Sequence, residues 1–151
     1  MRVAIVGSRD WADLDRVCQF VKALAKKYPR AIVFSGGARG VDETAEEAAY
    51  LSGLSVVSYR PVRIAESDEA ECWTVRISTD RQSARDWVLE KRSVPAPTFG
   101  SFRAAAFFRN FWLSEDGEQI VAFQRNGSRG TQNTIDNARS LGKEPHIYRE
   151  E

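Results

Sequence analysis

The first 58 residues alternate short apolar runs with longer stretches of helical periodicity, and this order restricts the fold more than any other feature. Apolar runs lie at 3–6, 31–34 and 54–58, and apolar residues recur at helical spacing over 14–28 and 41–51. Short apolar runs that end in turns are typical of buried parallel strands. Strands and helices that alternate with short connections predict right-handed crossovers and a parallel sheet.

The same order returns in the last third of the chain. An aromatic-rich helical pattern covers 101–113, and a fourth apolar run at 120–123 precedes a helical pattern at 131–141 and a last strand at 146–148. We therefore expect one α/β domain over residues 1–151. Its predicted architecture is a Rossmann-like three-layer sandwich around a mostly parallel sheet of about five strands.

The segment 60–98 interrupts this pattern and is interpreted as an insert. Residues 60–92 contain seven basic residues, seven acidic residues and no glycine. Three apolar residues alternate with polar ones, which predicts one strand with a single buried face: Trp73, Val75 and Ile77. A polar helix is expected over 80–92 and a stiff connector at 95–97. We expect the insert to form a lid or an interaction arm rather than part of the core.

Charge and cysteine content limit the binding partners and the cellular location that we expect for this chain. The chain has 22 Lys and Arg residues against 21 Asp and Glu, a net charge of +1, which argues against broad non-specific binding to nucleic acid or membrane. We recognise neither a secretory signal nor an apolar stretch of bilayer-spanning length, so we expect a cytoplasmic protein. Cys18 and Cys72 are predicted to be free thiols, and no metal or cofactor is expected.

Three predicted strands end in turns that combine glycine with arginine. Their residues are Gly7, Ser8 and Arg9 in the first turn, Gly36, Gly37, Arg39 and Gly40 in the second, and Gly127, Ser128, Arg129, Gly130 and Thr131 in the third. Because parallel strands share a direction, these turns meet at one edge of the sheet, where open α/β sheets bind ligands. Glycine permits close backbone approach, and helix N-termini and arginine favour phosphate or carboxylate groups. The turns therefore predict one anion-binding site, of neither the Walker A nor the Gly-x-Gly-x-x-Gly type.

Four polar residues near these turns have two interpretations each. Ser8 and Thr131 could donate to phosphate or cap the following helix. Asp42 could bind a ribose hydroxyl or act as a base, or only favour the first turn of its helix. Arg109 lies beside Asn110 in an otherwise apolar helix, where a charge needs a ligand or a carboxylate as partner. The surrounding aromatic residues favour a core or dimer face over a base-stacking platform.

The motifs in these turns, together with Arg109–Asn110, resemble the SLOG superfamily, and most closely its YpsA- and YspA-related bacterial and phage branch. The resemblance covers about 1–58 and 100–148. It implies a Rossmann-like sheet and a site for nucleotides or nucleotide-derived ligands. We therefore expect a binding module, such as a sensor, in which Asp42 and Arg109 are the catalytic candidates if the protein is an enzyme.

Two related families indicate alternative functions. The phosphoribohydrolases of the LOG family, which hydrolyse the N-glycosidic bond of nucleoside monophosphates, have an arginine that matches Arg109, but their glutamate falls on Thr134 here. A hydroxyl cannot replace that carboxylate, so such a hydrolase would need Asp42 in its place. The DprA family implies single-stranded DNA as a partner. A homodimer through the aromatic helix is a further open hypothesis.

Overall fold

The computed structural model describes residues 1–77 and 98–151, which form one seven-stranded sheet in the order β5-β4-β3-β2-β1-β6-β7. The strands are β1 (Arg2–Gly7), β2 (Ile32–Ser35), β3 (Ser55–Arg63), β4 (Ala70–Ile77), β5 (Thr98–Phe99), β6 (Gln119–Arg125) and β7 (His146–Glu150). β1, β2, β3, β6 and β7 are parallel, and β4 and β5 extend the sheet as antiparallel strands beyond β3. The predicted fold class is confirmed, with a larger sheet than expected.

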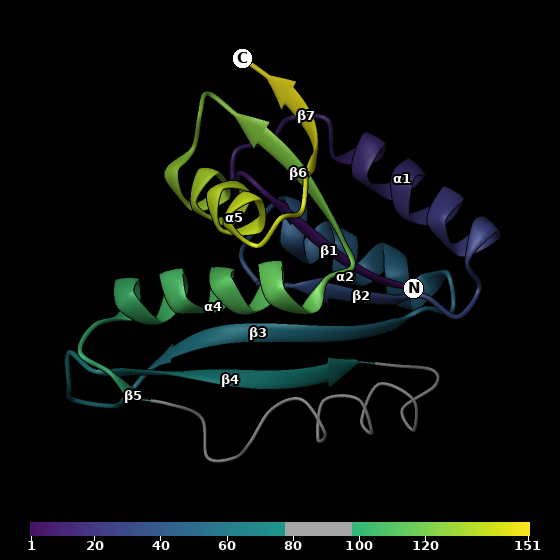
Figure 1. Ribbon diagram of the computed structural model, residues 1–151. Coiled ribbons are helices and arrows are strands. Elements are labelled where there is room, and N and C mark those ends of the chain that lie inside the picture. Colours follow the sequence, from purple (N-terminus) through teal and green to yellow (C-terminus); the bar gives the residue numbers. More distant parts are fainter. Residues whose placement is uncertain (78–97) are drawn as a thin grey trace.

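Helices cover both faces of this sheet (Figure 1). The helices are α1 (Leu14–Lys27), α2 (Val41–Leu51), α4 (Phe102–Asp116) and α5 (Arg129–Ser140). α1 begins where the Asp13 carboxylate accepts a hydrogen bond from the Arg16 amide, and α4 begins where the Ser101 hydroxyl accepts one from the Ala104 amide. Side-chain oxygens at such positions satisfy amides that have no partner inside the helix. α1 and α2 pack on one face, and α4 and α5 pack on the other.

The alternation of side chains along the strands supplies both cores. Val3, Val33 and Phe123 point toward α1 and α2, whereas Ala4 and Phe34 point toward α4 and α5. Successive residues of a strand point to opposite faces, so a strand covered on both sides must be apolar throughout. This requirement explains the short, unbroken apolar runs of the sequence.

The first part of the predicted insert joins the core, which corrects our expectation that it lies outside it. The predicted strand is present as β4, but Trp73 is 54% exposed, and the buried residues are Ala70 and Cys72, on the other face of the strand. Cys72 lies opposite Pro61 of β3 and packs in the core beneath α4. The small side chains fit under that helix, so the larger apolar residue turns outward. The helix and connector expected at 80–92 and 95–97 lie outside the described residues.

Two smaller predictions concern the cysteines and the membrane. Cys18 is half-buried and Cys72 is buried, and within the described residues the two cysteines are not joined in a disulfide. Within the described residues, every helix falls short of the length and apolar character required for crossing a bilayer.

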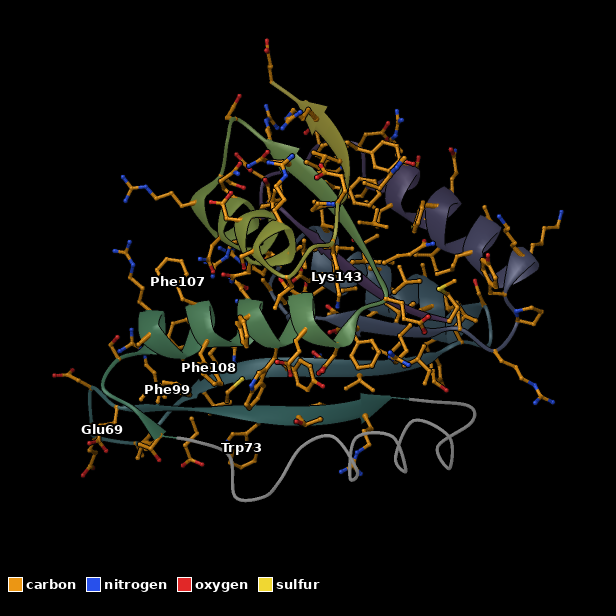
Figure 2. The ribbon with its side chains drawn as sticks, in the orientation of Figure 1. Glu69, Trp73, Phe99, Phe107, Phe108 and Lys143 are labelled. Carbon is orange, nitrogen blue, oxygen red and sulfur yellow. The ribbon has the colours of Figure 1, made fainter. Side chains whose placement is uncertain are left out.

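The C-terminus of α4 is held by one lysine side chain. Lys143 Nζ donates to the carbonyl oxygens of Ser114, Glu115 and Gly117 at 2.8, 2.8 and 2.7 Å (labelled in Figure 2). The last carbonyl groups of a helix have no partner inside it, and an ammonium group also opposes the negative end of the helix dipole.

We expect Lys143→Met to lower the free energy of unfolding by about 2–3 kcal/mol, because a charged donor is lost from three carbonyl oxygens. Urea unfolding monitored by circular dichroism measures this change. Lys22→Met, on the exposed side of α1, is the matched control and should change stability by less than about 0.5 kcal/mol. Equal effects of the two substitutions would contradict the role of Lys143.

Candidate functional site

A cavity of about 330 Å³ opens at the carboxyl edge of the sheet, where β1 lies between β2 and β6. The chain continues from β1 to β2 and β3 on one side and later places β6 on the other. Such a reversal of strand order separates the following turns and leaves a crevice between them. The cavity is lined by the turn after β1, the start of α2, one side of α4 and the start of α5. Its volume lies at the lower end of the range for small-molecule sites.

The turns after β1 and β6 are joined by their serine side chains. The hydroxyl oxygens of Ser8 and Ser128 lie 2.6 Å apart, and the Ser8 oxygen also accepts a hydrogen bond of 2.8 Å from the Arg125 amide. Ser8 is therefore a structural link as well as a residue of the cavity wall. Ser128 precedes α5, and within the described residues its side chain makes no capping bond to that helix. Gly130 and Thr131, in the first turn of α5, line the cavity.

The second turn brings a buried acid and a buried arginine together around Gly36. A methyl group on Gly36 would lie 2.7 Å from Arg109 Nη1 and 2.9 Å from Asp42 Oδ2. These separations are too short for a carbon atom, so only glycine leaves space for both groups. Arg109 Nη1 donates to the carbonyl oxygen of Gly36, and Arg109 Nε donates to the Asn110 side-chain oxygen at 2.9 Å. The predicted need of Arg109 for polar partners is met within the protein.

The fold perturbs the titration of the Asp42 carboxyl group. Burial raises the pKa of its carboxyl group to about 6, and the positive charge of Arg109 opposes that rise. Oδ2 accepts a hydrogen bond of 3.2 Å from the Ala38 amide, whereas Oδ1 has no partner among the described residues. Burial also lowers the pKa of Arg109, while Asp42 raises it. A carboxyl group with a pKa near neutrality can exchange protons with a ligand.

α4 contributes six residues to the cavity wall, and three of them follow one another at intervals of four and three, which places them on one side of the helix: Arg103, Phe107 and Asn110. The Asn110 amide donates to the Gly130 carbonyl at 3.3 Å and to the Asn133 side chain at 3.1 Å, so it ties α4 to α5. Arg103 lies over the Phe107 ring, with its guanidinium carbon 5.2 Å from the ring centre.

The cavity includes some of the predicted site residues and not others. It is lined by Gly7, Ser8, Arg9, Asp42, Arg109, Asn110, Ser128, Gly130 and Thr131. Gly36 lies directly behind Arg109 and Asp42. Five other predicted residues do not line the cavity: Gly37, Arg39, Gly40, Gly127 and Arg129. The side chains of the two arginines are exposed. Gly40 has a φ of 81° and lies against the Arg9 backbone, which explains that glycine without a ligand.

Thr134 also lines the cavity, at the position where the LOG family has glutamate. Its hydroxyl donates to the Gly130 carbonyl of the preceding turn at 3.3 Å. The side chain is therefore used within α5, and the Asp42 carboxyl group on α2 is the acid of this cavity that is both buried and incompletely bonded.

Sequence reasoning missed Arg103 and assigned Phe107 to a core or dimer face. The available signal was their spacing with Asn110, because the three positions repeat along one side of a helix. It also missed the pair formed by Glu46 and Arg60, which are 2.8 Å apart beside the second turn. The Arg60 side chain occupies the space that a side chain at Gly37 would need.

Residues 1–63 match the YspA, cpYpsA-related SLOG family. The predicted resemblance to the SLOG superfamily is confirmed. The matched region contains the first two glycine turns and Asp42, whereas the residues of α4 and α5 come from the rest of the chain. No curated protein matches this chain in sequence.

Solved structures have a similar fold. The protein TM1055 superposes with a TM-score of 0.58 at 23% identity, over 94% of this chain and 70% of that one. DNA processing protein A of Helicobacter pylori, described in its single-stranded DNA binding mode, has a TM-score of 0.63 at 18% identity, over 97% of this chain. DprA of Streptococcus pneumoniae has a TM-score of 0.64 at 16% identity, over 98% of this chain. This chain spans 64% and 49% of those two DNA processing proteins, and the likeness concerns the fold.

Proposed function

We propose that the cavity binds a nucleotide or a nucleotide-derived molecule and that the protein acts as a binding module or sensor. The observation that carries the proposal is the meeting of Arg9, Arg109 and the start of α5 around one cavity. Arginine side chains and the amides of a helix N-terminus are the groups that bind phosphate oxygens. The Asp42 carboxyl group, whose Oδ1 has no partner among the described residues, offers an acceptor for a ribose hydroxyl.

A panel of nucleoside monophosphates, diphosphates, cyclic nucleotides and sugar nucleotides tests this proposal by thermal shift. A ligand that binds only the folded protein raises the melting temperature, by an amount that grows with its concentration. Mass spectrometry of the recovered ligand then separates binding from turnover. The absence of any shift across the panel would reject the proposed ligand class.

We expect Arg9→Ala to weaken nucleotide binding about tenfold, since it loses one charged contact to phosphate. The binding constant is measured by isothermal titration calorimetry. Arg30→Ala is the matched control, because Arg30 is an exposed arginine just before β2, at the opposite edge of the sheet. Arg39→Ala and Arg129→Ala test the predicted contacts that fall outside the cavity wall. A loss of nucleotide affinity confined to those two variants would mean that the phosphate binds outside the cavity.

A second candidate function is N-glycosidic hydrolysis of a nucleoside monophosphate. The observation that favours it is the carboxyl group of Asp42, which lines the cavity beside Arg109 and has a pKa of about 6. A group that titrates near neutrality can donate a proton to a leaving base or accept one from water. Release of free base that disappears in Asp42→Asn would support this function. Intact nucleotide after prolonged incubation would leave the binding module as the function.

Binding of single-stranded DNA is the remaining alternative, and the proposal predicts it to be weak. The H. pylori relative is described with single-stranded DNA, but this chain has a net charge of only +1. Extended DNA tracks need a positively charged groove, and their affinity falls steeply with salt. Retention of an oligonucleotide at physiological salt, with no response to mononucleotides, would favour DNA over the proposed ligand.

A further inference from the structure

Phe107 differs from the other aromatic residues of α4 in the direction it points. Phe108 packs with Phe99 at 4.9 Å and with Trp112 at 5.1 Å between ring centres, so it belongs to the side of α4 that faces β4 and β5. Phe107 points from the opposite side of the helix, away from Phe99 and Phe108 (Figure 2). It lines the cavity instead of that aromatic cluster.

The half-buried Phe107 ring meets a cation rather than another ring. Among the described residues, its aromatic contact is the Arg103 guanidinium group, 5.2 Å from the ring centre. A guanidinium group is planar and stacks on aromatic faces, as a nucleobase does. A flat group therefore already lies over the face of this ring.

The cavity wall combines polar and charged groups with one aromatic ring. Arg9, Ser128 and Thr131 lie at the turns after β1 and β6, and α4 supplies the Phe107 ring together with the charged Arg103 and Arg109. A ligand that carries an anionic group and a planar ring matches this combination. A phosphosugar without a ring would leave the Phe107 face unused.

We infer that Phe107 is the stacking surface for a nucleobase and that Arg103 covers that surface when no base is present. This inference rests on the proposed nucleotide site and adds the part of the ligand that the site selects. It assigns ligand specificity to the N-terminal half of α4, which precedes the buried Arg109 in the sequence. The site is then built to distinguish a nucleotide from its ribose phosphate fragment.

Calorimetric titration of the full chain with AMP and with ribose 5-phosphate tests the inference. Wild type should bind AMP more tightly, and Phe107→Ala should weaken AMP binding by about 5- to 100-fold, the range expected from loss of base stacking. The same substitution should change ribose 5-phosphate binding by less than about twofold, because that ligand has no ring. Phe107→Trp should retain AMP binding, and Phe107→Leu should lose it.

Phe108→Leu is the matched control, because Phe108 lies on the same helix but outside the cavity. An equal loss of affinity for both ligands in Phe107→Ala would overturn the stacking role. Wild-type affinity for AMP in Phe107→Leu would also overturn it. Dissociation of a dimer by Phe107→Ala, without an effect on AMP, would assign the ring to a subunit contact and also overturn it. If wild type binds neither AMP nor any other nucleotide of the panel, the proposed site itself fails.

Discussion

Arg109→Gln is expected to destabilise the protein by about 3–5 kcal/mol at pH 8 and to abolish nucleotide binding. The substitution removes a cation whose positive charge stabilises the ionised Asp42 carboxylate in a buried setting. Loss of one member of a buried charge pair leaves the other uncompensated, which is the costly case. Glutamine is also too short to retain the bonds from Nη1 to the carbonyl oxygens of Gly36 and Tyr59.

Urea unfolding at two pH values tests this expectation. The loss should be smaller at pH 5, because the Asp42 carboxyl group, with its pKa of about 6, is then mostly protonated. The double variant with Asp42→Asn should recover part of the loss at pH 8, since it removes the uncompensated charge. Arg103→Gln, on the exposed side of the same helix, is the control and should change stability little. Additive losses in the double variant would show that the two groups do not interact.

The stability of Asp42→Asn relative to wild type is expected to increase as the pH rises from acid to alkaline values. The pKa of Asp42 is raised from 3.8 to about 6, so the folded state holds its proton more tightly than the unfolded state does. The resulting penalty is absent below pH 3.8, grows as the pH rises to about 6 and is complete above that value. At full size the penalty is roughly 3 kcal/mol.

The measurement is the difference in unfolding free energy between Asp42→Asn and wild type at pH 4 and at pH 8. Asparagine cannot ionise, so this difference should shift by up to roughly 3 kcal/mol in favour of the variant as the pH rises. Glu47→Gln changes an exposed acid of the same helix and should show no comparable shift. A difference that does not depend on pH would mean that the Asp42 carboxyl group titrates normally.

The order of the elements could be predicted from sequence because each depends on local pattern. β1 follows from an unbroken apolar run, and α1 follows from apolar residues at helical spacing. The approach of Asp42 to Arg109 could be expected only through the family resemblance, since 67 positions separate them in the sequence. Their shared contact with Gly36 is a property of the folded chain.

The sequence prediction for the orientation of β4 was wrong because tertiary packing determines which face of that strand is buried. Alternation in β4 predicts two faces but does not say which faces the core, and Trp73 was placed on the wrong one. The choice depends on α4, whose Trp112 packs against Tyr59 and leaves room beneath it for Cys72. The ligand contacts of Arg39 and Arg129 stay a prediction, because an arginine beside a glycine turn can point to the ligand or to solvent.

The hydroxyl contact between Ser8 and Ser128 joins positions 120 residues apart. Contacts between distant parts of a chain form late, because a long loop must first be closed at an entropic cost. The cavity therefore cannot exist in any folding intermediate that lacks β6, even if β1 to β3 have already paired. Ligand binding accordingly reports the completion of folding, and a fragment limited to residues 1–63 would carry the family signature without the ability to bind.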